Sequence, residues 1–437
     1  MLVGRLLLMD LISNIQSRET PVFVLGLGYV GLPLALAAAG AGFKVTGIDT
    51  DAHRVEQILG SDPALPDIDH EHLRQLVRSG ALRATPSIPE LPADSIIVIC
   101  VPTPLKNSLP DTSYIEGAGR EIGLRLKKGS LVILESTTYP GTTEELLLPI
   151  LESSGLKAGI EFFLGFSPER IDPGNHDFGL ANVTKVFGGI NEDSGDAIEA
   201  FYAAFVDKLA RVSTPRAAEM TKLLENTYRH VNIALANEMA ILCRDLGIDV
   251  WEVIDAAATK PFGFVPFYPG PGWGGHCIPV DPAYLSWRVR QMGSTARFVE
   301  LAREFNEKMP GYVIDRTKEI VESRGGNLKR SSVLAIGVTY KADVPDLRES
   351  PAFEIVKGLV KVGAEVSYHD PFIEQVDLPG GPLRSVELTA ETVAASDLVI
   401  VLTAHSAIDW GLIRRSAKVV FDTRNVIKQS QGLLVKL

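Results

Sequence analysis

Short apolar runs that end in glycine, proline or hydroxyl residues dominate the first half of the chain. The run PVFVLG, residues 21–26, passes directly into GLGYVGLPLALAAAGAGF, which is typical of a strand, a glycine turn and an alanine-rich helix. The runs KVTGID, DSIIVICVPTP, SLVILESTTYP and EFFLGF continue the series. This alternation predicts a parallel sheet of βα units, in which ligands bind at the carboxyl ends of the strands.

Two local patterns predict further helices in this half. Residues 1–15 favour a short amphipathic helix over a secretory signal, because Asp10 interrupts the apolar run and no small-residue cleavage site follows. Thr142 and Glu145, after a Tyr-Pro-Gly turn, have the spacing of a capping box at the start of another helix. No apolar run in the chain is long enough to span a membrane.

The apolar period becomes helical from Thr214 to Gly247, which is roughly nine turns, with Thr214 and Pro215 as the predicted cap and first helical position. A helix of this length suggests a connector between domains or the core of a dimer. After Gly325 the strand pattern returns in SSVLAIGVTY, AEVSYHDP, SDLVIVLTAH and AKVVFDTRNVI, but its first turn, GVTYKADV, lacks the three glycines. We therefore predict an α/β fold of two Rossmann-like, doubly wound domains at 1–212 and 326–437, joined by a central helical region at 213–325.

Composition narrows the classes of function. Hydrophobic residues make up 46% of the 437 residues and charged residues 22%, which indicates a globular protein. The formal net charge of −11 argues against nucleic acid or an anionic membrane as partner. Three cysteines lie far apart, at Cys100, Cys243 and Cys277, without metal-ligand spacing. We expect no metal site and no disulfide framework, and a reducing cytoplasm fits best.

The first glycine turn has dinucleotide-binding spacing, with Gly26, Gly28 and Gly31 in the pattern G-x-G-x-x-G. The motif follows a predicted strand, opens a helix, and precedes Asp49 at the end of the second strand. An acid there binds the ribose hydroxyls and repels a 2′-phosphate, so NAD is favoured over NADP. The alternative is a plain strand-to-helix turn.

Cys277 lies in the glycine- and proline-rich loop PGPGWGGHCIPVDP, next to His276 and four residues before Asp281. A free cysteine is usually a small buried hydrophobe, and that interpretation suits Cys100 and Cys243. In this loop, backbone amides and a nearby cation such as His276 would lower the thiol pKa and favour a nucleophilic thiolate.

Polar residues interrupt the long helix and follow the EFFLGF strand. Lys222 and Asn226 share one face at i, i+4, and Asn237 and Glu238 follow; function competes here with an ordinary solvated face. Glu169, in GFSPERIDPGN, is either a general base at a strand end or an exposed loop acid.

The motifs GLGYVGLP, VPTP, ESTTYPGTTEE, SPER, TKLLENTY, GGHCIPVDP, TYKADVPDLRESP and FDTRN, in this order, resemble the nucleotide-sugar 6-dehydrogenases, the family of UDP-glucose and GDP-mannose dehydrogenases. The resemblance runs from about Pro21 to Val426. It implies an NAD-binding N-terminal domain, a central helix that forms a homodimer and a C-terminal domain that binds the UDP moiety. It also implies a four-electron oxidation in which two NAD molecules in succession convert a C6 alcohol into a carboxylate.

Individual roles follow from the same resemblance. Cys277 is implied to form a thiohemiacetal and then a thioester, with Lys222 and Asn226 stabilising the C6 oxyanion. Asp281 would orient Lys222 or a water, and Glu169, near Thr137, would help to deliver the hydrolytic water. Further NAD contacts are implied at Tyr29, Val30, Arg54, Pro102, Thr103 and Thr137, and substrate contacts at Glu169, Arg170, Lys222, Asn226, Gly274, Lys341, Arg348 and Arg424.

Two departures bear on the substrate. The UDP-glucose branch usually carries a lysine where this chain has Val280, and Pro-Glu-Phe where it has Pro168, Glu169 and Arg170. The loops most resemble the branch that acts on N-acetylated sugars, UDP-N-acetylglucosamine above all, with UDP-N-acetylmannosamine as the nearest rival. The expected role is supplying uronate precursors for a surface polysaccharide. A two-electron dehydrogenase of related fold and a non-catalytic NAD sensor remain the alternatives.

Overall fold

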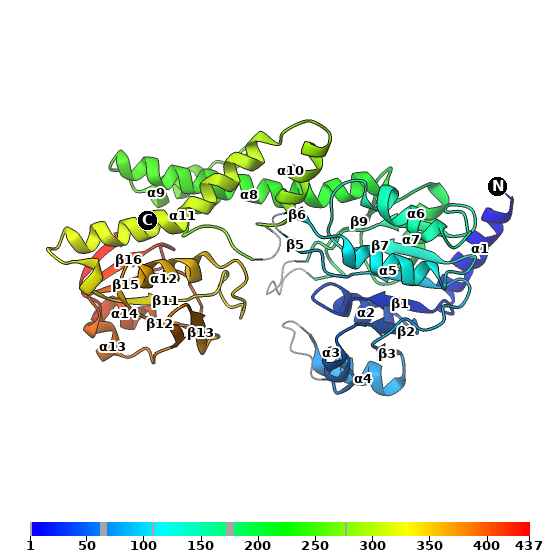
Figure 1. The fold of residues 1–437 in the computed structure, drawn as a ribbon, viewed down its shortest axis with the longest axis horizontal. Helices are drawn as coiled ribbons and strands as arrows, with labels where there is room; N and C mark the ends of the chain where they lie inside the picture. Colours follow the sequence, from blue (N-terminus) through cyan, green and yellow to red (C-terminus); the bar gives the residue numbers. More distant parts are fainter. Residues whose placement is uncertain (1, 62–67, 107–108, 172–178, 276–277) are drawn as a thin grey trace. The chain divides into compact units, whose positions relative to one another are not determined.

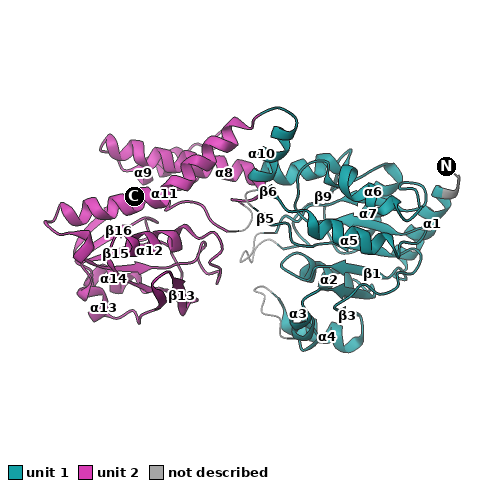
Figure 2. Ribbon diagram, in the orientation of Figure 1, with its two compact units in different colours: residues 1–225, 283–294 teal, residues 226–282, 295–437 magenta. Residues whose placement is uncertain are grey.

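The computed structural model describes residues 2–61, 68–106, 109–171, 179–275 and 278–437 (Figure 1). These residues form two compact units (Figure 2). The first comprises residues 1–225 and 283–294, and the second comprises 226–282 and 295–437. Each unit contains one large sheet.

The sheet of the first unit has eight strands in the order β10-β9-β8-β7-β4-β1-β2-β3. All neighbours are parallel except the antiparallel pair β8 and β9. The strands are β1 Val22–Leu25, β2 Val45–Ile48, β3 Leu82–Thr85, β4 Ile96–Ile99, β7 Leu131–Leu134, β8 Phe163–Phe166, β9 Lys185–Gly189 and β10 Leu209–Arg211, with a separate small hairpin of β5 Leu105–Lys106 and β6 Leu109–Pro110.

Both faces of the central strands β8, β7, β4 and β1 are buried, which explains why these strands are nearly continuous apolar runs. Along β1, Val22 and Val24 belong to the core beneath α1, α2 and α7, whereas Phe23 and Leu25 belong to the core beneath α5 and α6. The helices of this unit are α1 Leu2–Gln16, α2 Gly31–Gly40, α3 Ala52–Leu59, α4 His70–Ser79, α5 Ser113–Gly123, the π-helix η1 Thr142–Leu147, α6 Leu148–Glu152 and α7 Glu192–Tyr202.

The predicted capping box at Thr142 is wrong. The position before η1 is Gly141, with φ +105°, and no side chain of that turn caps the helix. Instead the carboxylate of Glu219, on α8, accepts hydrogen bonds from the amides of Gly141 at 2.5 Å and Thr143 at 2.9 Å. Glu145 binds Arg288 in place of the cap. A carboxylate from a distant helix thus satisfies two amides at the start of this helix, and no local acid does so.

The long helix α8 spans Pro215–Asp245 and runs from the first unit into the second. The hydroxyl of Thr214 accepts a hydrogen bond from the amide of Ala217 at 3.1 Å, so the predicted cap is confirmed. The helix α10, Asp281–Gln291, also has residues in both units. The remaining helices of the second unit are α9 Val250–Ala258, α11 Arg297–Glu322, the 3₁₀ helix η2 Leu328–Arg330, α12 Pro351–Lys361, α13 Ala390–Ala395 and α14 Trp410–Ser416.

The sheet of the second unit is parallel throughout, in the order β12-β11-β15-β16-β17. Its strands are β11 Ser332–Ile336, β12 Glu365–His369, β15 Leu398–Val401, β16 Val419–Asp422 and β17 Leu433–Lys436, and a hairpin of β13 Gln375–Leu378 and β14 Gly381–Arg384 lies outside it. Two doubly wound α/β sheets and a long central helix confirm the predicted fold class.

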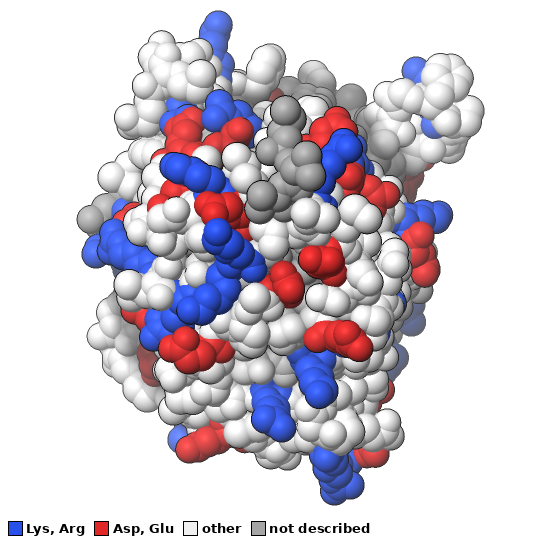
Figure 3. Space-filling model, turned by 90° about the vertical axis from the view of Figure 1, so that its right-hand side faces the viewer, with Lys and Arg blue, Asp and Glu red and all other residues white. Residues whose placement is uncertain are grey.

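Two searches of the described residues bear on partners. None of the described helices is long and apolar enough to cross a membrane. Within the same residues, histidine, cysteine and acidic side chains form no group of three that could hold a metal ion. On the face drawn in Figure 3, basic and acidic side chains are interspersed among neutral ones.

Candidate functional site

The glycines of the first turn have two different structural roles. Gly26 has φ +88°, and a Cβ on it would lie 2.5 Å from the carbonyl oxygen of Cys100, after β4. A Cβ on Gly31 would lie 1.8 Å from the carbonyl oxygen of Gly26. A Cβ on Gly28 would meet nothing within 4 Å. The first and third glycines therefore allow the chain to pack on itself, while the second faces open space, as close approach of a pyrophosphate requires.

Asp49, directly after β2, braces this turn. Its carboxylate accepts hydrogen bonds from the amides of Leu27 at 2.9 Å and Asp51 at 3.0 Å. The guanidinium of Arg54 donates to the carbonyl of Leu27 at 3.4 Å. Asp49 is partly exposed, and a carboxylate has about four acceptor positions, so capacity remains for ribose hydroxyls.

The other predicted cofactor contacts lie at the same edge of the sheet. Leu25 of β1 pairs with Ile99 of β4, and Gly26 and Pro102 follow these strands. β1 and β4 flank the point where the strand order reverses, which is where such sheets bind dinucleotides. The carbonyl of Thr103 is held by the hydroxyl of Tyr284 at 2.9 Å. Tyr29 and Val30, before α2, and Thr137, after β7, complete the predicted set.

These observations fit NAD. The open space at Gly28 and the amino end of α2 suit a pyrophosphate, and Asp49 suits an unphosphorylated ribose. A 2′-phosphate would face the carboxylate of Asp49, which is a repulsive arrangement.

Glu169 is buried, with 8% of the residue exposed, and three donors hold its carboxylate. One oxygen accepts from the amides of Arg170 at 2.6 Å and Ile171 at 2.8 Å, and the other from the ammonium of Lys185 at 3.0 Å. Burial alone would raise the pKa of Glu169, but Lys185 and the two amides outweigh it and lower that pKa. Glu169 is therefore an ionised, fixed acceptor and not an exposed loop acid.

The sequence reading missed the partners of Glu169. Lys185 also binds the carboxylate of Glu135 at 3.1 Å, and the hydroxyl of Tyr202 donates to Glu135 through a short hydrogen bond. All three side chains are buried. The available signal was a charged residue at the margin of an apolar strand, in LVILE for Glu135 and in KVFGG for Lys185.

Arg170 is predicted to bind substrate, and its guanidinium has protein partners in the structure. It donates to the carbonyl of Thr184 at 2.7 Å and pairs with Glu225 on α8 at 2.7 Å. These contacts tie the strand end that carries Glu169 to the first half of the long helix.

Along α8 the polar residues differ in their contacts. Lys222 is partly exposed, whereas the buried amide of Asn226, one turn later, donates to the carboxylate of Asp281 through a short hydrogen bond. Asn237 is fully buried; it donates to Asn306 at 2.9 Å and accepts from the amide of Gly270 at 2.9 Å. Asn237 thus anchors the start of the cysteine loop.

Cys277 and His276 lie outside the described residues, so the predicted nucleophile and its neighbouring cation are not placed. The described part of the loop packs tightly on the second unit. A Cβ on Gly274 or Gly275 would lie 2.7 Å or 2.6 Å from atoms of Tyr340, and the amide of Gly275 donates to the carbonyl of Arg348 at 3.2 Å. These glycines therefore admit the Tyr340 side chain.

The three basic residues predicted to bind the nucleotide sugar follow strands of the second sheet at their carboxyl ends. Lys341 and Arg348 lie in the loop after β11, and the guanidinium of Arg348 pairs with Asp346 at 2.7 Å. Arg424 follows β16 and donates to the carbonyl of Leu402 at 2.8 Å. Burial lowers the pKa of Arg424 to about 10, against the attraction of Asp422.

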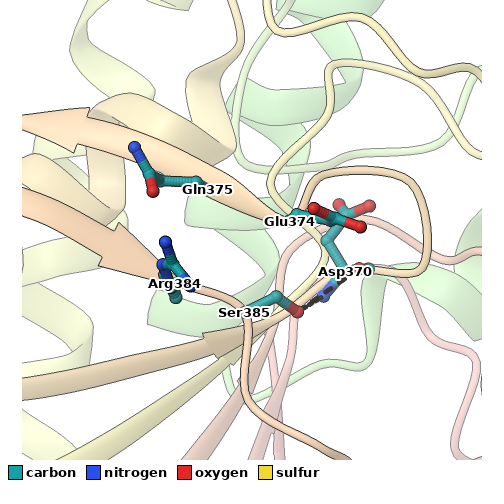
Figure 4. Close-up of a pocket in the computed structure, with 5 residues that line it drawn as sticks. All are labelled: Asp370, Glu374, Gln375, Arg384 and Ser385. Atoms are coloured by element: carbon teal, nitrogen blue, oxygen red, sulfur yellow. Dashed lines mark hydrogen bonds between the residues drawn. The ribbon is translucent and has the colours of Figure 1, made fainter.

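The hairpin of β13 and β14 borders a hollow of about 340 Å³, shown in Figure 4. None of the predicted site residues lines it; its lining is Asp370, Glu374, Gln375, Arg384 and Ser385. The carboxylate of Asp370 is already engaged by the amides of Val338 and Phe372 and by His405. We assign no ligand to this hollow.

Comparison with protein families covers most of the chain. Residues 20–206 match the NAD binding domain of the UDP-glucose/GDP-mannose dehydrogenase family, 216–308 its central domain and 334–429 its UDP binding domain. Apart from the edge strands β10 and β17, the two sheets thus fall largely in the regions matched to NAD binding and UDP binding.

Relatives similar over nearly their full length are named for different sugars. The NDP-N-acetyl-D-galactosaminuronic acid dehydrogenase of Ralstonia nicotianae is 38% identical, covering 96% of this chain and 98% of its own. The UDP-N-acetyl-D-glucosamine 6-dehydrogenase of Pseudomonas aeruginosa is 35% identical, covering 89% and 91%. The structure of the UDP-D-ManNAc dehydrogenase of Pyrococcus horikoshii superposes with a TM-score of 0.87 at 32% identity, covering 95% and 99%.

The open space at Gly28 predicts separable effects of two alanine substitutions. Gly28→Ala should fold normally but bind NAD at least tenfold more weakly, about 1.4 kcal/mol, because its methyl group would occupy the approach of the pyrophosphate. Gly31→Ala should instead lower thermal stability, because its methyl group meets the backbone of Gly26. Calorimetric titration with NAD and thermal unfolding check both; wild-type NAD affinity in Gly28→Ala would contradict the assignment.

Proposed function

Because the chain belongs to the UDP-glucose/GDP-mannose dehydrogenase family and is an NAD-dependent UDP-sugar 6-dehydrogenase, we propose that its substrate is a UDP-N-acetylhexosamine. The observation that carries this proposal is that the three relatives described above, which match nearly the whole chain at 32%, 35% and 38% identity, are named for N-acetylated sugars, whereas a UDP-glucose dehydrogenase of similar coverage is 27% identical. Val280 and Arg170, which stand where the UDP-glucose branch usually has lysine and phenylalanine, support it.

UDP-N-acetylglucosamine is the leading candidate on the resemblance of the cysteine loop. UDP-N-acetylmannosamine is the second candidate, favoured by the fold similarity to the P. horikoshii dehydrogenase. A pocket distinguishes such epimers by roughly 1 to 3 kcal/mol per small contact, so direct assay has to decide. We further propose that the uronate product enters a surface polysaccharide and that the enzyme acts in the cytoplasm.

The proposed reaction removes four electrons from C6 in two hydride transfers. When bound, NAD accepts one hydride from C6 in each oxidation, and two molecules are used in succession. The first oxidation gives an aldehyde, which yields a second hydride readily only after a nucleophile has made its carbon tetrahedral. The thiolate of Cys277 adds to that carbon as a thiohemiacetal, the second oxidation leaves a thioester, and water cleaves the C–S bond to give the carboxylate.

The remaining residues have supporting roles in this proposal. Lys222 and Asn226 stabilise the oxyanion on C6, and Asp281 orients Asn226 through the hydrogen bond that joins them. Glu169 holds the hydrolytic water as a hydrogen-bond acceptor. Thr137 is the threonine that the family resemblance places near it. Lys341, Arg348 and Arg424 supply the positive charge that binds the diphosphate of the substrate. Local cations are needed for this because the protein as a whole is acidic.

The stoichiometry of NADH tests the four-electron reaction. With limiting UDP-N-acetylglucosamine we expect two NADH per sugar, measured at 340 nm as an end point, because the aldehyde is oxidised before release. Parallel reactions with UDP-N-acetylmannosamine, UDP-N-acetylgalactosamine and UDP-glucose rank the substrates by kcat/KM.

Each other end point supports a different function. One NADH per sugar would indicate a two-electron dehydrogenase that stops at the carbonyl. NAD binding without turnover of any of the four sugars would favour a non-catalytic sensor. Faster turnover of UDP-N-acetylmannosamine would establish the second candidate.

Replacing the proposed nucleophile tests the thioester. Cys277→Ser should lose at least a hundredfold in steady-state rate, because a serine alkoxide forms less readily and an ester is cleaved more slowly than a thioester. Mass spectrometry of the quenched variant should show a covalent sugar adduct or an arrested aldehyde. Cys243→Ser, at a buried cysteine of α8, is the matched control, and undiminished turnover in Cys277→Ser would remove that residue from the mechanism.

We propose that the enzyme is a homodimer through α8. Exposed apolar side chains form a stripe along this helix at spacings of three, four and seven residues: Met220, Leu224, Tyr228, Leu235, Met239 and Leu242, with Leu246 directly after its last residue. Side chains with this spacing share one helix face, and a contiguous exposed apolar face marks an association site. A second copy of α8 offers the same face, as a two-fold interface requires.

Charge placed on the stripe should separate the subunits. Leu242→Glu is expected to give a monomer at concentrations where the wild type is a dimer, measured by sedimentation equilibrium, because a carboxylate would have to be desolvated in the interface. Leu124→Glu, at a still more exposed leucine directly after α5, is the control and should leave the mass unchanged. A dimeric Leu242→Glu would place the interface elsewhere.

A further inference from the structure

Four buried polar side chains of the first unit form one connected chain of contacts. Tyr202 donates to Glu135, Glu135 binds Lys185, and Lys185 binds Glu169. The exposed fraction of the Lys185 side chain is 3%, and that of Glu135 is 0%. Burying a charge without a partner is costly, so each of these four side chains depends on its neighbours for a hydrogen-bond or ion-pair partner.

Strand register explains why Lys185 reaches Glu169. In the antiparallel pair of β8 and β9, Phe166 lies opposite Gly188. Glu169 lies three residues after Phe166 and Lys185 three residues before Gly188, so the antiparallel course of the two segments brings the side chains within hydrogen-bond distance. Glu135 follows β7, the other neighbour of β8, and so approaches the same ammonium group from the adjacent strand.

The contacts fix both oxygens of Glu169. Two backbone amides of its own turn hold one oxygen, and Lys185 holds the other. The backbone donors come with the local chain, but the Lys185 contact comes from a different strand and can be removed without changing the turn. Lys185 in turn is held by Glu135 and lies 5.2 Å above the centre of the Tyr202 ring.

We propose that Lys185 is a positioning residue for the reaction: it holds the Glu169 carboxylate ionised and oriented for the hydrolytic water, with Glu135 and Tyr202 as its supports. This inference rests on the proposed function, which gives Glu169 its part in thioester cleavage. In that step the water oxygen bonds to the thioester carbon, the C–S bond breaks with its electron pair on sulfur, and the protons of water pass to the leaving groups and solvent. Glu169 keeps the water aligned by accepting a hydrogen bond from it.

The charges around Glu169 agree with this arrangement. Burial raises the pKa of Glu135 above its usual range, with repulsion from Glu169 adding to it and Lys185 opposing it, whereas the pKa of Glu169 is lowered. Burial and the negative charge of Glu135 also raise the pKa of Cys100, after β4, which leaves that thiol neutral. The long helix α8 contributes one charged group next to this segment, the carboxylate of Glu225, which pairs with the guanidinium of Arg170.

Lys185→Met tests the proposal through pH. An opposite charge at this distance lowers a carboxyl pKa by about one to three units, so its removal should move the acid limb of the steady-state rate upward by a comparable amount. At pH values below the new limb, acid-quenched Lys185→Met should accumulate the thioester on Cys277, measured by intact-protein mass spectrometry. Raising the pH should restore hydrolysis, and Lys185→Arg should keep the limb within half a unit of wild type.

Three further variants separate positioning from folding damage. Glu135→Gln keeps an acceptor oxygen but removes a second negative charge that attracts Lys185, so the acid limb should not rise even if the melting temperature falls. Glu219→Gln removes another buried carboxylate of the same unit, whose partners are Gly141 and Thr143, and should lower stability without moving the limb. Glu169→Gln combined with Lys185→Met should be no slower than Glu169→Gln alone, because both changes remove the same function.

The outcomes distinguish this inference from the function on which it rests. If the wild type gives two NADH per sugar and Lys185→Met is slow at every pH with an unshifted limb and no thioester, Lys185 is structural only and the inference fails. Additive losses in the double variant would also overturn it. If the wild type forms no thioester at all, the proposed function fails, and the part proposed for Lys185 in thioester cleavage fails with it.

Discussion

Both sheets depend on one close approach of backbone to backbone. After the first strand of each sheet the chain turns at a glycine with positive φ, Gly26 or Gly337, where a Cβ would lie 2.5 Å from the carbonyl oxygen that follows the neighbouring strand. That carbonyl belongs to Cys100 in the first sheet and to Thr403 in the second. Only glycine allows this contact, and the contact sets the carboxyl ends of two parallel strands side by side. The predicted NAD contacts at Gly28 and Tyr29 and the predicted substrate contact at Lys341 follow closely after these two turns.

The two turns then diverge in a way that explains their different ligands. In both, the amide after the glycine donates to an aspartate that follows the second strand: Leu27 to Asp49 at 2.9 Å and Val338 to Asp370 at 2.7 Å. Asp49 remains partly exposed and can still accept from a ribose. Asp370 is buried, and its carboxylate also lies 3.1 Å from the ring nitrogen Nε2 of His405. The aspartate at this position therefore has the structural role of stabilising the turn. The loop it braces carries Lys341 and Arg348, which suits a diphosphate held by side chains.

Features that depend on local order were predictable from the sequence, and those that depend on register were not. Apolar runs, the glycine spacing and the cap at Thr214 are written in consecutive residues, and the structure confirms them. The prediction of a capping box was wrong. The amides of Gly141 and Thr143 instead bind the carboxylate of Glu219, on a helix far along the chain. Lys185 was missed for the same reason, since only the pairing of β8 with β9 shows that it faces Glu169. The roles of Cys277 and its companions still rest on resemblance.

The buried lysine constrains how Glu169 can assist hydrolysis. A general base is most effective when its pKa lies near the working pH, yet Lys185 and two amides lower the pKa of this carboxylate. A carboxylate with a lowered pKa is a weak base at neutral pH. It therefore serves better as a hydrogen-bond acceptor than as a general base. Thioester cleavage suits such a group, because a thiolate of lowered pKa is a good leaving group and departs without a proton from a general acid. The strand that presents Lys185 therefore favours aligning the water over removing its proton.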